Sequence, residues 1–186
     1  ASKQIGFDMN RVAYNPHGFS FLQQNESFIK RKVYYNLEKY ASRLGGTIVG
    51  CSKGEADEAK KFSEKVININ NSIDTIKIDE LIPDLKLNRT SENLVIGTVG
   101  RISYQKNPKM FNEIAKAFPN YKFIWIGDGN NKNVLTASNI IVTGWKKRDE
   151  VLNLVSNLDI YMMTSMWEGL PISLLEAMYL KKYCIV

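Results

Sequence analysis

Histidine and cysteine are both scarce in this sequence. The 186 residues include one histidine and two cysteines, Cys51 and Cys184, which lie far apart. So few nitrogen and sulfur ligands do not make up a typical zinc site, and we expect no metal cofactor. Each cysteine lies in a short apolar run. We therefore interpret both as small buried hydrophobic residues of a reducing compartment, with a disulfide as the less favoured alternative.

Long apolar segments are also missing. No run approaches the roughly 20 residues that a membrane-spanning helix needs, and no signal-peptide pattern is present, so we expect a cytoplasmic protein. The formal net charge of +6 suits an anionic partner, such as nucleic acid, an anionic membrane surface or a phosphorylated small molecule. Nucleic acid is the least favoured of these, since no helix-turn-helix, zinc or RNA-binding motif is present.

Both ends of the sequence are unusual. It begins at Ala1 without a methionine and stops at Val186 inside the apolar run Tyr-Cys-Ile-Val. We expect this chain to be a fragment, truncated at the C-terminus.

Short β-branched runs alternate with helical patterns along the chain, which predicts parallel βαβ units. Several runs are apolar at consecutive positions, as in strands that are buried on both faces. The predicted fold class is therefore α/β, a Rossmann-like parallel sheet with helices on both faces. The predicted strands are Arg11–Tyr14, Thr47–Cys51, Val66–Ile69, Leu94–Val99, Lys122–Ile126, Ile140–Val142, Ile160–Met163 and Tyr183–Val186.

Residues 70–92 are rich in Asn, Asp and Ser and follow no steady period, so we interpret them as a connection between two domains. The predicted organisation is a partial N-terminal domain at 1–74, a connection at 75–90 and a second domain at 91–186. The predicted helices are Ser27–Ser42, one capped by Ser52 with Glu55 completing a capping box, Pro108–Phe118, Lys147–Asn157, and one that starts at Pro171 and runs to Leu180.

Two glutamates surround the start of the last predicted helix. Glu168 lies in the loop before it, and Pro171 suits the first helical position. The backbone amides of Gly169, Leu170 and the first turn then lack helical partners and attract phosphate. The helix is apolar nearly all round, so Glu176 is expected to be buried, which is costly without hydrogen-bond partners. Sugar hydroxyls would serve as partners, and pairing with an internal lysine or backbone group is the alternative.

Two cations follow the strand Leu94–Val99. Arg101 and Lys106 lie between Gly100 and a predicted helix start at Pro108. Ligands of open α/β sheets bind beyond the carboxyl ends of strands, where an arginine and a lysine together would neutralise a diphosphate. Two ordinary solvated surface cations are the alternative.

Weaker patterns follow other strands. Gly127 lies in Ile126-Gly-Asp-Gly, which on its own indicates only a tight turn. Trp145 would stack on a nucleotide base or be buried in packing. His17, in Pro16-His17-Gly18, lies in a turn after a short strand, where a lone histidine is more often structural. The basic, aromatic stretch Lys30–Tyr40 would contact an anionic membrane surface or form a solvated helix face.

The run Thr164-Ser-Met-Trp-Glu-Gly-Leu-Pro-Ile-Ser-Leu-Leu-Glu-Ala-Met closely resembles the glutamate-pair motif of glycosyltransferase family 4, the retaining GT-B enzymes. The resemblance implies that Glu176 holds the nucleotide ribose, that Glu168 contacts the transferred sugar, and that the amides of Gly169 and Leu170 hold the diphosphate.

Other segments resemble the same family. Gly-Arg101…Lys106-Asn-Pro resembles its diphosphate-binding loop, Gly127 its Gly-x-Gly turn near the donor, and Trp145 lies in the region that faces the base. His17 resembles the histidine that faces donor and acceptor from the N-terminal domain. The family's glycine-rich loop near its start is missing from this chain.

The resemblance implies a retaining hexosyltransferase-type enzyme that moves a sugar from a nucleotide-diphosphate-sugar donor to a glycan or lipid-linked acceptor. Bacterial surface polysaccharide or capsule synthesis is the implied setting, with possible peripheral contact at the inner face of the membrane. No metal is needed, because cations and amides can stabilise the diphosphate leaving group, and the sequence has no Asp-x-Asp motif. The alternative is a non-catalytic nucleotide-sugar-binding fragment.

Overall fold

The computed structural model describes residues 8–83 and 93–186, which form two compact units. The first unit holds the chain up to Asn71 together with Trp167–Leu170, and the second holds Ser72–Met166 and Pro171–Val186. The predicted boundaries at 74 and 91 stay predictions.

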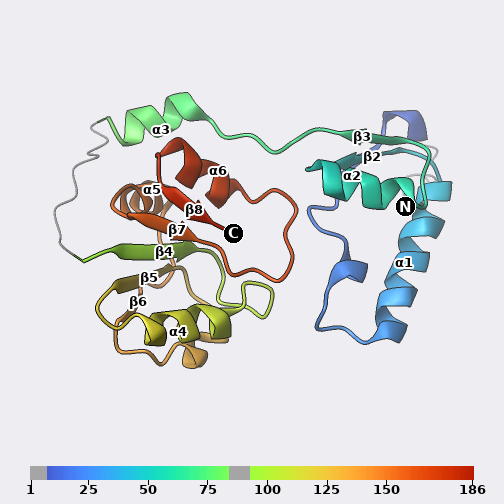
Figure 1. The fold of residues 1–186 in the computed structure, drawn as a ribbon. Coiled ribbons are helices and arrows are strands. Elements are labelled where there is room, and N and C mark those ends of the chain that lie inside the picture. The colour runs from blue at the N-terminus through green and yellow to red at the C-terminus, as the bar shows by residue number, and fades with distance from the viewer. Residues whose placement is uncertain (1–7, 84–92) are drawn as a thin grey trace. The chain divides into compact units, whose positions relative to one another are not determined.

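The second unit is built on a five-stranded sheet in the order β6-β5-β4-β7-β8, and every neighbouring pair is parallel (Figure 1). The chain adds β5 and β6 on one side of β4 and then crosses to add β7 and β8 on the other. Each strand matches a predicted one to within a residue at each end. The bounds are Val95–Val99 (β4), Lys122–Ile126 (β5), Ile140–Val142 (β6), Ile160–Met162 (β7) and Tyr183–Ile185 (β8).

Both faces of this sheet are covered, because neighbouring strand residues point to opposite sides. Phe123 and Trp125 of β5 pack on the face covered by α4 (Pro108–Ala117), around the fully buried Phe111. Ile126 and Tyr161 pack on the other face, with buried residues of α3, α5 and α6. The predicted fold class, a parallel sheet with helices on both faces, is therefore confirmed.

Helix α3 (Thr75–Leu81) is a feature that the sequence analysis missed. Asp74 suggested a break in the chain, but its Oδ1 accepts a hydrogen bond from the backbone N–H of Lys77 and caps the helix. Ile78 is 1% exposed in the core of the second unit. The helix is only seven residues long, so its apolar period was too short to recognise.

Helices α5 (Arg148–Ser156) and α6 (Ile172–Tyr179) follow β6 and β7. Pro171 has an extended ψ of 129° and is the N-cap of α6, so the predicted helix start was one residue early. The prediction that α6 is buried nearly all round was wrong, since Ile172 is 45% exposed and Met178 is 58% exposed.

The first unit contains a three-stranded parallel sheet in the order β1-β2-β3. Its core is an aromatic cluster in which Phe19, Phe21, Tyr35 and Phe62 meet at ring-centroid distances of 4.9–6.0 Å. The strands are Ala13–Tyr14 (β1), Thr47–Gly50 (β2) and Val66–Asn68 (β3), and the helices are Phe28–Arg43 (α1) and Lys53–Lys60 (α2). Short 3-10 helices occur at Met9–Arg11, Ser20–Leu22 and Lys132–Val134.

The predicted capping box of α2 is only half formed. The Ser52 hydroxyl accepts a hydrogen bond from the backbone N–H of Glu55, as expected. The Glu55 carboxylate, however, accepts from the backbone N–H groups of Gly18 and Cys51. These two hydrogen bonds replace the expected bond from the Ser52 backbone N–H, and the one from Gly18 is a tertiary contact.

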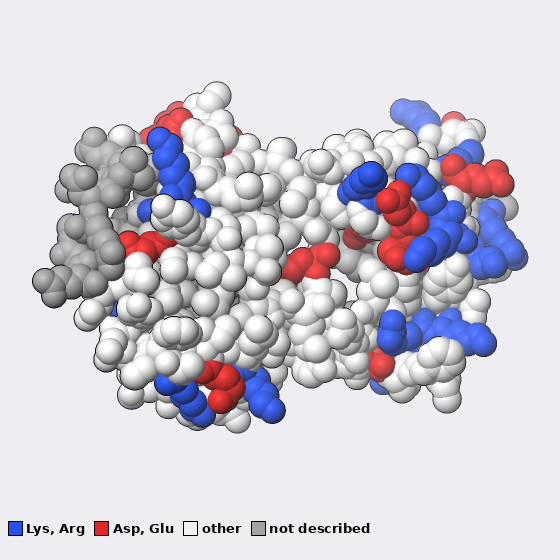
Figure 2. Space-filling model, in the orientation of Figure 1, with Lys and Arg blue, Asp and Glu red and all other residues white. Residues whose placement is uncertain are grey.

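Charged side chains of the first unit gather over its helices, and Figure 2 shows Lys and Arg clusters interspersed with acidic residues there. Many of these charges form ion pairs one turn apart, such as Lys61 with Glu58 and Lys30 with Glu26. Within the described ranges, no helix is long and apolar enough to cross a membrane.

Candidate functional site

The crossover between β4 and β7 creates a topological switch point in the sheet of the second unit, and its carboxyl edge is where open α/β sheets bind ligands. The loop after β4 is held there by the segment after β7. The Thr164 hydroxyl donates to the backbone carbonyl oxygens of Lys106 (2.9 Å) and Asn107 (3.3 Å), and the Met166 N–H donates to that of Gln105 (2.8 Å). The loop with both predicted cations thus has a fixed place at this edge.

Arg101 and Lys106 both lie beside Gly100, immediately beyond β4. The Lys106 chain folds over Gly100, so that a Cβ there would lie 3.0 Å from Lys106 Cε and 3.6 Å from Nζ. Arg101 is exposed and Lys106 is half-buried. The structure therefore brings the two cations to one loop at the carboxyl edge, as expected for groups that neutralise a bound anion.

The loops after β4 and β5 pack backbone against backbone. Trp125 donates from Nε1 to the Gly100 carbonyl oxygen at 2.9 Å, and the Ile102 N–H donates to the Asp128 carbonyl oxygen at 2.9 Å. At Gly127 (φ +142°) a Cβ would lie 2.2 Å from the Gly100 carbonyl oxygen. Gly127 is therefore required for this close approach. Its predicted contact with a donor stays a prediction.

A cavity of about 310 Å³ opens beside these loops in the second unit and is lined by residues of four segments at the carboxyl edge. Trp145 contributes an indole ring that is 78% exposed, so the alternative of a buried, packed tryptophan was wrong. Next to it, the Lys146 ammonium pairs with Glu150 at 3.1 Å. The lining residues are Val99, Gly100, Arg101, Ile126, Gly127, Asp128, Trp145, Lys146 and Val151.

Glu176 is buried in α6, as predicted, with 5% of its surface exposed. Its Oε1 lies 2.6 Å from Nη1 of Arg148. That oxygen is fully buried and receives no well-aligned hydrogen bond from any described residue, so the contact is an ion pair with a poorly directed N–H. Burial raises the pKa of Glu176 above its ordinary value, and the charge of Arg148 opposes the rise. The partner in this structure is thus a cation, as in the alternative interpretation, but it is an arginine that reaches in from the surface and not an internal lysine.

Arg148 is the site residue that the sequence analysis missed. It is the first residue of α5, where the helix dipole disfavours a positive charge. A cation at this position was a recognisable signal, because acidic residues are usual there. Its partner on α6 is distant in sequence, so the pairing itself could not be read from the chain.

Glu168, Gly169 and Leu170 belong to the first unit, although they directly precede Pro171 in the sequence. The Leu170 carbonyl oxygen accepts from Asn71 Nδ2 at 2.7 Å. Gly169 lies against Cys51, and a Cβ there would be 2.8 Å from its Sγ. The predicted roles of Glu168, Gly169 and Leu170 in donor binding stay predictions.

The Cys51 thiol lies under this loop. Burial and, next, a hydrogen bond with Glu55 raise its pKa, whereas the Leu170 backbone N–H acts in the opposite direction. Both cysteines are free, with Cys51 buried and Cys184 half-buried, in agreement with the expected role as small apolar residues.

His17 lies in a turn directly after β1, as expected. It has a left-handed φ of +47°, and its N–H donates to Asn15 Oδ1 at 3.3 Å. The imidazole is exposed, and the buried Glu55 holds the turn through the next amide, that of Gly18. The geometry presents the ring to solvent, and a catalytic role for it stays a prediction.

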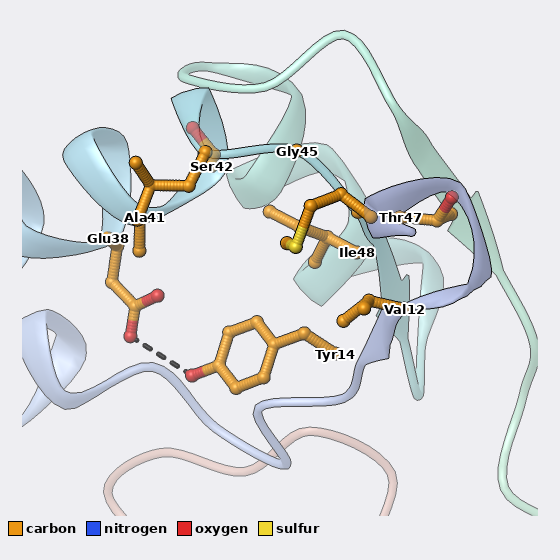
Figure 3. Close-up of a pocket in the computed structure, with 11 residues that line it drawn as sticks. Val12, Tyr14, Glu38, Ala41, Ser42, Gly45, Thr47 and Ile48 are labelled. Atoms are coloured by element: carbon orange, nitrogen blue, oxygen red, sulfur yellow. Dashed lines mark hydrogen bonds between the residues drawn. The ribbon is translucent and has the colours of Figure 1, made fainter. Parts of the chain in front are cut away.

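A second cavity, of about 220 Å³, lies in the first unit between α1 and the start of β2 (Figure 3). The Tyr14 hydroxyl donates to Glu38 Oε1 at 3.1 Å across it, and burial followed by Glu38 raises the pKa of Tyr14 to about 12. Val12 and Thr47 line it at the amino ends of their strands. Because ligands of such sheets bind at the carboxyl ends, we do not assign this cavity to the functional site.

Comparisons with known proteins show a family match over the second unit. The family described as glycosyl transferases group 1 matches residues 79–186, which include Arg101, Lys106, Trp145 and Glu176. The chain is also 30% identical over 200 residues to the UDP-Gal:alpha-D-GlcNAc-diphosphoundecaprenol alpha-1,3-galactosyltransferase of Escherichia coli, covering 94% of this chain and 51% of that protein.

Two further similarities extend over most of the chain. It is 27% identical to the O-antigen biosynthesis glycosyltransferase WbnH of Escherichia coli, covering 90% of this chain and 48% of that protein. The crystal structure of Anabaena Alr3699/HepE in complex with UDP and glucose shares the fold, with a TM-score of 0.69 at 19% identity, covering 98% of this chain and 53% of that one. The chain thus spans about half the length of the curated relatives it matches.

The glycine requirement at this site is testable by substitution. We expect Gly127→Ala to lower the free energy of unfolding of the second unit by about 1–3 kcal/mol, because the added Cβ collides with the Gly100 carbonyl oxygen. Gly54→Ala in α2 is the control: its Cβ meets only the Ser52 hydroxyl, at 3.9 Å, so stability should stay the same or rise. Urea unfolding measures both, and an unchanged midpoint for Gly127→Ala would contradict the close approach.

Proposed function

Because the chain belongs to the glycosyl transferases group 1 family, we propose that it binds a nucleotide-diphosphate-sugar and serves the transfer of that sugar to a glycan or lipid-linked acceptor. The observation that carries the proposal is the arrangement of the second unit. Arg101 and Trp145 line one cavity at the carboxyl edge, Lys106 lies against Gly100 on the same loop as Arg101, and Glu176 is buried in α6 of the same unit. Cations suit a diphosphate, a carboxylate suits ribose hydroxyls, and an exposed indole suits a base.

The chemistry of transfer follows from charge. As the bond between the anomeric carbon and the diphosphate breaks, negative charge builds on the leaving group. Hydrogen bonds hold the backbone of the loop that carries Arg101 and Lys106 before the reaction begins. The loop therefore does not need to rearrange for the two cations to stabilise this charge. A metal ion is not required for that step in our proposal.

The finer assignment is to glycosyltransferase family 4, with retention of anomeric configuration. The motif from Thr164 to Met178 supports it. We propose that Glu168 contacts the transferred sugar, that the amides of Gly169 and Leu170 contribute to diphosphate binding, and that His17 faces the reacting groups. The relatives are named for O-antigen synthesis and for a diphosphoundecaprenol-linked substrate, which supports a role in bacterial surface polysaccharide synthesis. We propose that this role is in the cytoplasm.

The test begins with donor binding. We expect calorimetry against UDP-, GDP- and ADP-sugars to detect binding of one nucleotide class. UDP is favoured, because one relative is named for UDP-Gal and one similar structure contains UDP. Glu176→Ala should weaken binding of that nucleotide roughly 10- to 100-fold, because a hydrogen bond to a charged group contributes about 1.5–3 kcal/mol.

Met178→Ala on the same helix is the matched control, since Met178 is 58% exposed, and it should change the affinity less than about twofold. Unaltered affinity in Glu176→Ala would contradict the ribose assignment. Binding without transfer or donor hydrolysis, even in a full-length protein, would instead favour a non-catalytic nucleotide-sugar-binding protein.

We further propose that α1 contacts an anionic membrane surface. Ile29, Val33, Leu37 and Tyr40 form a stripe along one side of the helix and are 50–74% exposed. Lys and Arg side chains are interspersed along the same helix (Figure 2). Such a combination favours the interface of anionic lipids.

Co-sedimentation with vesicles tests the contact. We expect binding to vesicles that contain phosphatidylglycerol, little binding to phosphatidylcholine vesicles, and a several-fold loss in Ile29→Ser/Leu37→Ser. Equal binding to both lipid compositions, or no effect of the double substitution, would refute it.

A further inference from the structure

The ion pair between Arg148 and Glu176 joins two helices in the second unit. The two residues lie 28 positions apart in the chain, at the start of α5 and in the middle of α6. Glu176 is 95% removed from solvent, given its exposed fraction of 5%, whereas the Arg148 side chain is 47% exposed. The arginine therefore reaches inward from the surface to a carboxylate that has little contact with water.

The position of Arg148 at the start of a helix does not favour a cation, if no other contact is considered. It is the first residue of α5, where the unpaired N–H groups and the helix dipole favour negative charge. Asp149 and Glu150 follow that preference, and Glu150 accepts the backbone N–H of Lys147 at the start of the helix. A positive residue before them is explained by its contact with Glu176.

The pair lies next to the proposed nucleotide site. Val151 lines the cavity and is three residues after Arg148, so both side chains lie on one face of α5. Trp145 and Lys146, in the loop that leads into α5, line the same cavity. Arg148 therefore lies one helical turn from a residue of the cavity wall, while its guanidinium contacts Glu176.

We propose that Arg148 is a positioning residue, which holds the Glu176 carboxylate charged and in place to accept the ribose hydroxyls of the nucleotide. This inference rests on the proposed function. Oε1 of Glu176 is buried without a well-aligned hydrogen bond from any described residue. The guanidinium balances the charge at this buried oxygen, and the other carboxylate oxygen, Oε2, would accept the ligand hydroxyl.

The other titratable groups around α6 form contacts that do not involve Glu176. From α3, Asp79 accepts the Tyr179 hydroxyl at 2.8 Å. From β8, Tyr183 is 79% exposed and the Cys184 thiol is half-buried, with its pKa raised by burial. Among the described residues, Arg148 is the charged group that affects the pKa of Glu176. The remaining charged residues of α3 and α5 are exposed: Lys77, Glu80, Asp149 and Glu150.

The sign of the pH dependence follows from these causes. Burial raises the pKa of Glu176 and Arg148 lowers it. Without Arg148 the pKa rises further, so the carboxylate becomes protonated at a higher pH as the solution is acidified. Ribose binding, which needs the ionised carboxylate as an acceptor, should then fail at a higher pH than in the wild type.

The experiment compares UDP affinity between pH 6.0 and pH 8.5 in the wild type and in Arg148→Gln. The quantity of interest is the ratio of the two dissociation constants, because titration of the diphosphate affects both proteins equally. We expect this ratio to rise toward pH 6.0, by at most about tenfold for each unit by which Arg148 lowers the Glu176 pKa. Arg148→Lys, which keeps the charge, should restore most of the affinity.

Two further arms make the result specific. In a Glu176→Gln background, Arg148→Gln should have no pH-dependent effect. A carbon-13 titration of the Glu176 carboxyl, identified by its absence in Glu176→Gln, should show the higher pKa in Arg148→Gln without any nucleotide. A ratio that is constant with pH, as expected if Arg148 merely attracts the diphosphate or supports the fold, would overturn the inference. Failure of the wild type to bind UDP, GDP or ADP at any pH would overturn the proposed function as well.

Discussion

The close backbone approach between the loops after β4 and β5 is the constraint on which the site in the second unit depends. Gly127 admits the Gly100 carbonyl oxygen to a distance that no side chain would allow, and Trp125 donates a hydrogen bond to the same oxygen. This fixes the path of the chain just before Arg101. Thr164, beyond β7, holds the far end of the loop through the Lys106 carbonyl oxygen. The two cations are thus brought to one edge by hydrogen bonds in which side chains donate to backbone carbonyl oxygens.

The buried carboxylate of Glu176 imposes a second constraint. Burying a charge to 5% exposure costs free energy unless the charge is paired, and the surrounding apolar residues of α6 provide no hydrogen-bond donor. Arg148 provides the charge balance from a neighbouring helix. A buried pair of this kind is weak evidence for a role in stability, and we propose that it serves binding instead. The sheet supplies the rigid frame, and the polar groups at its edge supply the chemistry.

The sequence was sufficient to predict the strands of the second unit and most of its helices, and insufficient for the pairings between side chains. The eight strands of the described residues all fall within predicted apolar runs, and the central strands β4, β5 and β7 are the most buried in the second unit. Helix α3 was missed because its seven residues are too few to show a period. The partner of Glu176 and the Gly18 N–H that donates to Glu55 were missed because they depend on tertiary contacts between residues that are distant along the chain. The exposure of Trp145 was likewise decided by the path of its loop.

Hydrogen–deuterium exchange with and without UDP tests most directly whether the carboxyl edge of the second unit is the nucleotide site. Binding should slow amide exchange in residues 100–106 and 143–148, which line the cavity or hold its cations, while α1 in the first unit serves as an internal reference. Our account predicts protection in both segments together. Protection confined to residues 9–48, around the cavity of the first unit, or unchanged exchange at a saturating UDP concentration, would contradict it.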